Sequence, residues 1–387
     1  MNVKSEKGIN KIAVIVIIII LLLVVGWGTF FIFYFTTRTQ TSNQSANNVE
    51  NSIENNTANN IEEQPINNTQ NEQTNVIEPI IDLLPDSPIE NNQDTELLSQ
   101  SFYYNQLNNY GKIIYDGLKE NKEQLKTGTY VIDYDTAFNT LLHMEGGEEQ
   151  LNEAFQSAWN AFSYDDTALF YIDVSKMTLL KETTTLGGIE THRISIGPGQ
   201  NSSYLKEEFN TEEKINLAEE YIQGIVDQVI EQTDQDNVVL KAEKVHNLLV
   251  SIIEYEDASN NTNQFTIYGA LHDRKAVCEG YARAFKYLME QINVPCVLVS
   301  GTATNSQGET ETHAWNYIQI SNQWYAVDVT WDDPVVVGGG EATVDMMYQY
   351  FLKGSETFFT NHTEDGVISE GSMEFSFPML SVTDYPI

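Results

Sequence analysis

VCEGYARAF at residues 277–285, HAWN at residues 313–316 and WYAVDVTW at residues 324–331 are the stretches from which the fold can be predicted. They contain one thiol, one imidazole and one carboxylate, on Cys278, His313 and Asp328. In this order, these groups form a nucleophile, the base that activates it and the group that orients the base. The sequence therefore predicts a thiol enzyme with these three catalytic residues.

The first stretch predicts a helix that begins at Cys278 and ends near Ile292. Its apolar residues fall on one face at helical spacing: Tyr281, Phe285, Leu288 and Met289. The free N–H groups and the positive end of a first helical turn favour an anion, and thus a thiolate. For Cys278 alone, a small buried residue at a helix start is an equally good interpretation.

The second and third stretches predict a β-hairpin with Ser321-Asn322 as its two-residue loop. Ile320 then pairs with Gln323, and His313 and Asp328 become diagonal neighbours on one face, with backbones about 7–8 Å apart. At that separation the carboxylate can accept the Nδ1–H of the imidazole and hold one tautomer. A shift of one residue in register would put the two side chains on opposite faces.

The chain has two cysteines, so it has no disulfide framework and no cysteine-rich zinc site. A single bridge between Cys278 and Cys296 is the alternative. The predicted helix carries the chain roughly 20 Å from Cys278 at about 1.5 Å per residue, whereas a disulfide needs Cα atoms within about 7 Å. Cys296, in PCVLV, is therefore predicted to be a buried strand residue.

The net charge is -36, from 20 basic and 56 acidic residues. Such a field repels nucleic acid, so a nucleic-acid partner is excluded. No metal or cofactor site is predicted. Asp332-Asp333-Pro334 is typical of a turn rather than of an oxygen-ligand loop, and the glycines at residues 338–340 lack the strand and helix that flank a phosphate site.

The N-terminal part predicts a membrane anchor. Residues 12–35 are almost wholly apolar and uncharged, and they exceed the roughly 30 Å hydrocarbon core of a bilayer. Lysines precede this run, so residues 1–11 are expected in the cytoplasm and the rest of the chain outside the cell. A cleaved signal peptide is the alternative, but the run is long and ends in aromatic residues.

Three segments follow. Residues 36–94 are rich in Asn, Gln, Glu, Thr and Ser, which predicts a disordered linker. Residues 95–200 predict a small α+β accessory domain, and residues 201–387 predict the catalytic domain. The elements expected in them are helices at 102–125, 135–162, 211–232 and 237–253, and strands at 168–180, 191–196, 296–301, 311–320 and 323–329.

The stretches from Gly269-Ala-Leu to Asp332-Asp-Pro together resemble the bacterial pattern of the transglutaminase-like superfamily. The resemblance implies an α+β, papain-like core, in which the helix that begins with the cysteine packs on an antiparallel sheet carrying His and Asp. It also implies that Cys278, His313 and Asp328 form the catalytic triad, since each matches the family motif. Calcium activation, known in animal relatives, has no visible ligand loop here.

Two outcomes of the chemistry stay open at this stage. A thioester on Cys278 that is resolved by an amine makes the protein an acyltransferase, and one resolved by water makes it a peptidase or amidase. A surface binding module without turnover is the third alternative. In each case the expected partner is a protein or peptide.

Other polar and aromatic residues receive weaker interpretations. Trp315, Tyr268 and Trp331 are expected to line the cleft or to belong to the core. Asn316 is a candidate support for the catalytic histidine. The remaining histidines that we considered are expected to be structural or on the surface: His143, His192, His272 and His362.

Overall fold

The computed structural model describes residues 98–257, 261–333 and 344–386, together with the backbone of residues 36–40. The predicted membrane helix at 12–35, the cytoplasmic segment at 1–11 and nearly all of the predicted linker lie outside this range. Within the described part of the chain, no helix has the length and apolarity needed to cross a bilayer.

The centre of the C-terminal half is an antiparallel sheet in the order β10-β7-β8-β9. Its strands are β7 (Cys296–Thr304), β8 (Thr310–Ile320), β9 (Gln323–Val327) and β10 (His362–Glu364). The last strand in sequence thus adds to the free edge of β7, on the far side from the β8–β9 hairpin.

The β8–β9 turn has the predicted geometry. Ser321 and Asn322 have φ angles of 49° and 63°, as the two central residues of a type I′ turn require. Ile320 pairs with Gln323, so the predicted register is confirmed. Strand β9 ends at Val327, so Asp328 follows the strand instead of extending it.

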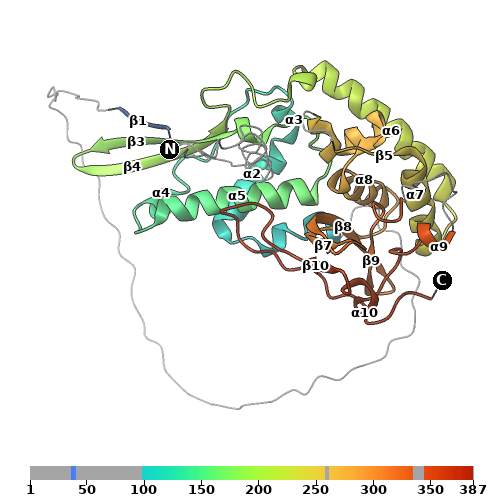
Figure 1. The fold of residues 1–387 in the computed structure, drawn as a ribbon. Coiled ribbons are helices and arrows are strands. Elements are labelled where there is room, and N and C mark those ends of the chain that lie inside the picture. The colour runs from blue at the N-terminus through green and yellow to red at the C-terminus, as the bar shows by residue number, and fades with distance from the viewer. Residues whose placement is uncertain (1–35, 41–97, 258–260, 334–343, 387) are drawn as a thin grey trace, which may run out of the picture. The chain divides into compact units, whose positions relative to one another are not determined.

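Helix α8 (Cys278–Gln291) packs on this sheet, and its predicted bounds are confirmed. The amide of Asn316 on β8 donates to the Ala282 carbonyl in α8 at 2.9 Å, so a buried side chain joins sheet and helix. Helices α6 (Glu212–Thr233) and α7 (Val238–Ile252) also contact α8 and lie at the outer side of the molecule (Figure 1). Thr211 caps α6 as predicted, by accepting from the Lys214 amide.

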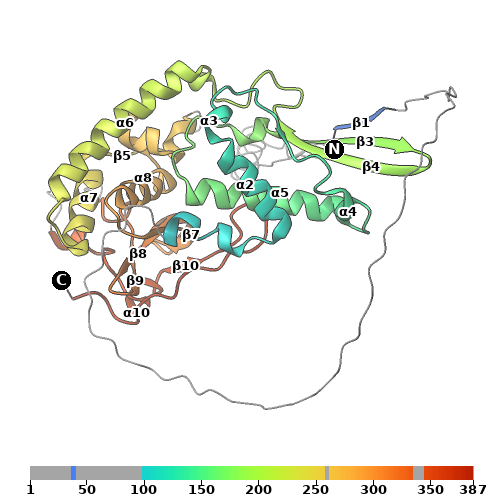
Figure 2. The same cartoon turned by 180° about the vertical axis from the view of Figure 1, so that it is seen from behind.

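The N-terminal half has two main helices, α2 (Asn109–Glu120) and α5 (Gly147–Asp165), which pack on each other. Its long hairpin joins β3 (Thr178–Leu186) to β4 (Ile189–Gly197), and the closed end of the hairpin projects beyond the helices (Figure 2). Strand β2 (Ile132–Asp133) pairs with β4, and β1 (Thr36–Gln40) pairs with β3.

Three predictions for this half were wrong in part. The expected helix at 102–125 is divided into η2 (Tyr104–Gln106), α2 and α3 (Lys122–Leu125). The expected strand at 168–180 is a strand only from Thr178, because Asp173 caps a short 3-10 helix, η3 (Val174–Lys176), by accepting from the Ser175 amide. Residues before it are buried as core: Phe170 stacks on Tyr268. The expected helix at 135–162 is instead two helices, α4 (Asn139–Leu142) and α5, separated by a turn in which Gly146 has φ 72°.

Short elements complete the described fold. They are η1 (Leu98–Ser101), η2 (Tyr104–Gln106), α3 (Lys122–Leu125), α4 (Asn139–Leu142), η4 (Glu207–Phe209), β5 (Glu254–Tyr255), η5 (Thr262–Phe265), η6 (Gly269–Asp273), β6 (Lys275–Ala276), α9 (Val344–Met347) and α10 (Ser355–Phe358). Residues 96–387 fall within one compact unit, with a continuous hydrophobic core. The domain boundary at residue 200 stays a prediction.

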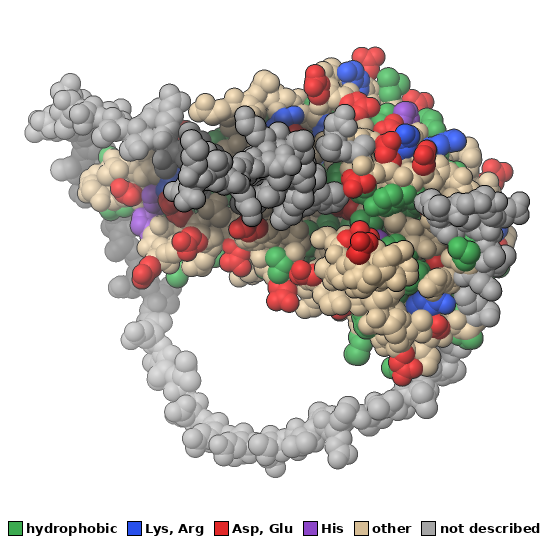
Figure 3. Space-filling model, in the orientation of Figure 1, with side chains coloured by type: hydrophobic (Ala, Val, Ile, Leu, Met, Phe, Trp, Pro, Cys, Tyr) green, Lys and Arg blue, Asp and Glu red, His purple; other side chains and the backbone are tan. Residues whose placement is uncertain are grey.

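The surface carries the acidic excess of the sequence. Asp and Glu side chains are spread over the face shown in Figure 3, and Lys and Arg side chains are fewer there. Charges distributed in this way keep a protein well solvated and repel polyanions.

The start of α8 depends on a glycine, which gives a testable prediction. A Cβ at Gly280 would lie 2.3 Å from the Gln264 carbonyl oxygen, which accepts the Val277 amide at 3.1 Å. Gly280→Ala should therefore lower the free energy of unfolding by about 1–3 kcal/mol. Gly224→Ala, in α6 where an added Cβ meets nothing within 4 Å, is the control and should raise it by about 0.5–1 kcal/mol. Urea unfolding measures the free energy of unfolding of both variants. Equal changes in the two would contradict the role given to the close approach between Gly280 and Gln264.

Candidate active site

Cys278 is the first residue of α8 and is partly exposed, whereas Cys296 on β7 has no exposed surface. Both thiols are free, so the alternative of a disulfide is wrong for this structure. Val277 precedes the helix in extended conformation and provides no side-chain cap. The amides of the first turn are thus left to interact with an anion at this end of the helix.

His313 lies on β8, where it pairs with Gly301 of β7, and its side chain is 3% exposed. Its Nε2 lies 2.7 Å from Oδ2 of Asp328, whose side chain is fully buried. The Cys278 thiol also interacts electrostatically with the imidazole. The structure therefore brings two of the three predicted residues, His313 and Asp328, into direct contact.

One detail of the prediction was wrong: Nε2, not Nδ1, contacts Asp328. The prediction placed Asp328 diagonally across a continued strand, but the chain turns away after Val327 and approaches the outer nitrogen of the ring. An ionised carboxylate only accepts hydrogen bonds, so Nε2 carries the proton. Nδ1 is then the nitrogen that remains for the cysteine thiol.

The electrostatics favour a charged imidazole. Burial works against the cation, but the charge and hydrogen bond of Asp328 and the contact with Cys278 outweigh it and raise the pKa of His313 to about 10. Burial likewise works against the Asp328 anion, and its two histidine partners hold the pKa of this carboxyl below its usual range. An imidazolium next to a cysteine stabilises the thiolate.

Backbone groups bind the other oxygen of Asp328. Oδ1 accepts from the amides of Thr330 and Trp331 at 3.1 and 3.2 Å. The Asp332 amide donates to the Asp328 carbonyl at 3.1 Å, which closes a helical turn directly after β9. The carboxylate thus acts as the cap of its own turn.

A second buried pair supports this turn. Asp332 contacts His246 of α7 through Oδ2 at 3.2 Å and accepts the Tyr350 amide through Oδ1 at 2.8 Å. His246 and Asp332 are both fully buried. Burial raises the pKa of Asp332 to about 6. Sequence reasoning missed this pair, because His246 is separated from the turn by 86 residues.

Sequence reasoning also missed His362, which it assigned to the surface or to a structural role. Its Nε2 lies 3.1 Å from Asp328 Oδ2, and its side chain is fully buried. The residue opens the short strand β10, and no local motif in the sequence signals its position.

Of the other residues considered from the sequence, the two tryptophans lie near His313, and the rest have contacts elsewhere in the fold. Trp331 lies beside His313, with ring centroids 5.1 Å apart, and Trp315 lies 6.1 Å from it. Tyr268 stacks on His272 and Phe170 and belongs to the core. Asn316 supports α8 rather than His313. In the accessory segment, His143 and His192 contact each other.

Among the described residues, His313, Asp328 and His362 are close enough to hold a metal ion, with ligand atoms within 4.8 Å of one another. However, both imidazoles already meet one carboxylate oxygen at hydrogen-bonding distances. A metal would need these atoms as ligands at about 2.0–2.2 Å from itself. The observed contacts fit a hydrogen-bonded cluster, and no metal is needed to explain them.

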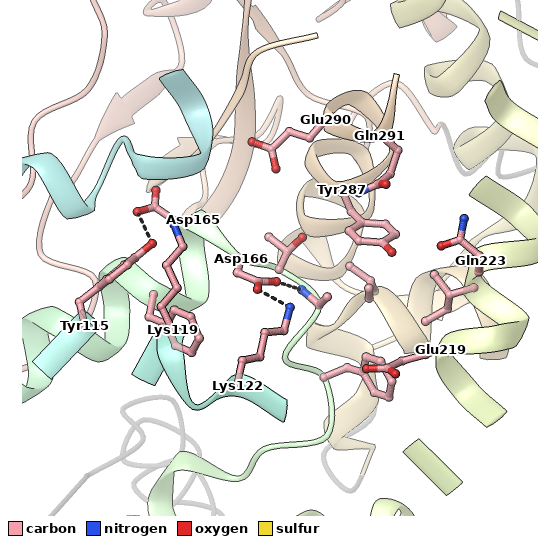
Figure 4. A pocket seen from close by; sticks show the side chains of 16 residues that line it. Tyr115, Lys119, Lys122, Asp165, Asp166, Glu219, Gln223, Tyr287, Glu290 and Gln291 are labelled. Carbon is pink, nitrogen blue, oxygen red and sulfur yellow. Dashed lines mark hydrogen bonds and ion pairs between the residues drawn. The ribbon is translucent and has the colours of Figure 1, made fainter. Parts of the chain in front are cut away.

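A cavity of about 460 Å³ lies elsewhere, between α2, α5, α6 and the C-terminal end of α8 (Figure 4). Its charged side chains are largely bound to neighbours: Lys122 pairs with Asp166, and Asp165 accepts from Tyr115. Tyr287 and Glu290 place it about 14–18 Å along the helix from Cys278. It is therefore separate from the site around the thiol.

The chain is similar to known proteins over part of its length. The model of the transglutaminase-like superfamily matches residues 223–329. The mouse kyphoscoliosis peptidase is 30% identical over 105 residues, covering 24% of this chain and 16% of the peptidase. The human kyphoscoliosis peptidase is 29% identical over 126 residues, covering 29% of this chain and 19% of the peptidase. The chain thus spans less than a fifth of these curated relatives.

Among solved structures, a crystal structure of a TGase matches with 12% sequence identity and a TM-score of 0.28. The match covers 46% of this chain and 50% of that chain.

The buried His313–Asp328 pair should make folding stability depend on pH. Because the pKa of His313 is raised, the contribution of the pair is fully present below about 6.5 and is lost as the pH rises through about 10. Because the pKa of Asp328 is lowered, the contribution is present above about 3.8 and is lost as the pH falls further.

Asp328→Asn should therefore lower the free energy of unfolding by about 3–5 kcal/mol near pH 6. It should also remove the decline between pH 6.5 and 10. Urea unfolding at a series of pH values, followed by tryptophan fluorescence, measures both effects. If the free energy of unfolding of Asp328→Asn depends on pH in the same way as that of the wild type, the His313–Asp328 pair is not the source of this dependence.

Proposed function

Residues 223–329 of this chain carry a transglutaminase-like core, and we propose that Cys278, His313 and Asp328 are its catalytic triad. The observation that supports this most is the buried 2.7 Å contact between His313 and Asp328, next to a partly exposed thiol. A thiolate–imidazolium pair of this kind is the activated form of a cysteine nucleophile.

The proposed reaction is acyl transfer through a thioester. The Cys278 thiolate attacks the carbonyl carbon of a protein or peptide amide, and the C–N bond breaks as His313 gives its Nδ1 proton to the leaving nitrogen. An amine or water then attacks the thioester, loses a proton to His313 and releases Cys278. Asp328 accepts from Nε2 throughout and holds the ring in place.

We propose transfer to an amine as the first outcome and hydrolysis as the second. The triad is common to both, so the acceptor decides between them. The hydrolytic outcome is supported by the relatives, which are named as peptidases. A binding module that retains the fold without turnover is the remaining alternative, and it predicts that Cys278 is unreactive.

We also propose that the chain is a single-pass membrane protein whose enzyme domain lies outside the cell. The uncharged apolar run at 12–35 and the lysines before it support this orientation. Residues 36–94 would serve as a tether, residues 95–200 as an accessory segment and residues 201–387 as the catalytic segment. The net charge of -36 argues against a nucleic-acid partner.

Selective alkylation tests the nucleophile. Iodoacetamide near neutral pH should modify Cys278 in the folded full-length chain, whereas Cys296 should react only after unfolding, because it has no exposed surface. His313→Ala should slow the first reaction by about ten-fold or more, since the imidazolium no longer stabilises the thiolate. Mass spectrometry of the labelled peptides gives both rates. Absent or His313-independent labelling of Cys278 would exclude thiol catalysis.

A second experiment separates the outcomes. The full-length chain is offered a glutamine-containing protein together with a labelled primary amine. Incorporation that disappears in Cys278→Ala supports transfer, whereas ammonia or peptide release without incorporation supports hydrolysis. If neither reaction depends on Cys278, the binding module is the better description.

A further inference from the structure

Asp328 receives two imidazoles on the same oxygen. Oδ2 lies 2.7 Å from Nε2 of His313 and 3.1 Å from Nε2 of His362. All three side chains have 3% exposed surface or less. The triad proposed above uses His313, so His362 is a buried titratable group whose role is unassigned.

The contact requires His362 to donate. Asp328 is an ionised carboxylate, so it only accepts, and Nε2 of His362 must carry a proton. The other ring nitrogen, Nδ1, lies 2.9 Å from Oδ1 of Asn361, whose amide nitrogen lies 2.9 Å from the Tyr350 hydroxyl. Asn361 thus links His362 to Tyr350.

The position of His362 is set from several directions. Its ring stacks on Phe358 of α10, with centroids 4.0 Å apart, and lies 4.7 Å from Trp331. Its backbone pairs with Ala303 of β7. Strand β10 comes this close to β7 because Gly301 has no side chain: a Cβ there would lie 2.1 Å from the Thr363 carbonyl oxygen.

We propose that His362 is a positioning residue that holds the Asp328 carboxylate ionised and oriented toward His313. This inference rests on the proposed function, because it assigns the residue a role in keeping the Cys278–His313 pair charged. His362 does not touch the thiol or the reacting atoms, and it acts only through Asp328.

The physical basis is the orientation of a buried anion. Two backbone amides bind Oδ1 of Asp328. Without His362, Oδ2 would have His313 as its one partner among the described residues. A second donor on Oδ2 offsets the cost of burying the charge and opposes rotation of the carboxylate. The titratable side chains that face His362 are Asp328 after β9, His313 on β8 and Tyr350 before α10.

The competing explanation is that His362 only fills space between Phe358 and Trp331. Three substitutions distinguish the two roles. His362→Gln keeps a donor at the position of Nε2, whereas His362→Asn is one methylene shorter and does not reach Asp328. His362→Phe keeps a ring of similar shape but has no donor.

The measurement is the rate of Cys278 alkylation by iodoacetamide as a function of pH, in the full-length chain. Protection of the buried Cys296 reports that each variant is folded, and Cys278→Ala gives the background. His143→Gln, in the exposed part of the accessory segment, is the control substitution and should match the wild type.

The expected order is that His362→Gln stays near the wild type, while His362→Asn and His362→Phe both lose about ten-fold in rate near neutral pH. In these two variants the acid limb of the profile should also move up by about one pH unit, because a carboxylate no longer held toward His313 stabilises the imidazolium, and through it the thiolate, less well. A profile in which His362→Phe is closest to the wild type would overturn the proposal in favour of space filling.

Equal rates in all three variants would also overturn it. If His362→Phe does not fold, the comparison of His362→Gln with His362→Asn still tests the proposal. Both side chains are amides, and they differ in whether they reach Asp328. Failure of the proposed function gives a different result, because the alkylation of the wild type itself would then not depend on His313.

Discussion

The structure of this site depends on a carboxylate that has no exposed surface. A buried anion is tolerated only when donors replace the water it has lost. Asp328 has four of them: two amides of its own turn, one imidazole from β8 and one from β10. The two backbone amides can bind Asp328 only if the chain turns directly after β9. The two imidazoles can bind it only if β8 and β10 both lie beside this turn.

The thiol is placed by a separate set of contacts. Gly280 allows η5 to cross the start of α8, and the Asn316 amide joins α8 to the sheet. The proposed pairing of Cys278 with His313 therefore depends on this packing. Neither part alone provides a charged base next to a nucleophile, so the site depends on the helix packing on the sheet.

Prediction from sequence succeeded where a short local pattern decided the structure. The Ser321-Asn322 turn determined the register of the hairpin, and the apolar period after Cys278 determined the bounds of α8. Prediction from sequence failed where contacts between residues distant in sequence decided the structure. The segment before Thr178 has strand-like residues, but it is held as buried core and a capped turn. The nitrogen that contacts Asp328 was also assigned wrongly, since β9 ends at Val327, two residues before the predicted end of this strand.

The sequence by itself determined the three residues of the proposed triad, the helix, the hairpin and the register, because turn chemistry and periodicity act over a few residues. Only the tertiary structure decided that Asp328 has a second histidine, that His246 and Asp332 support its turn, and that Nε2 rather than Nδ1 faces the carboxylate. The reason is physical. Compensation of a buried charge is a property of the space around it, and two of the four groups that supply it lie 15 and 34 residues away along the chain.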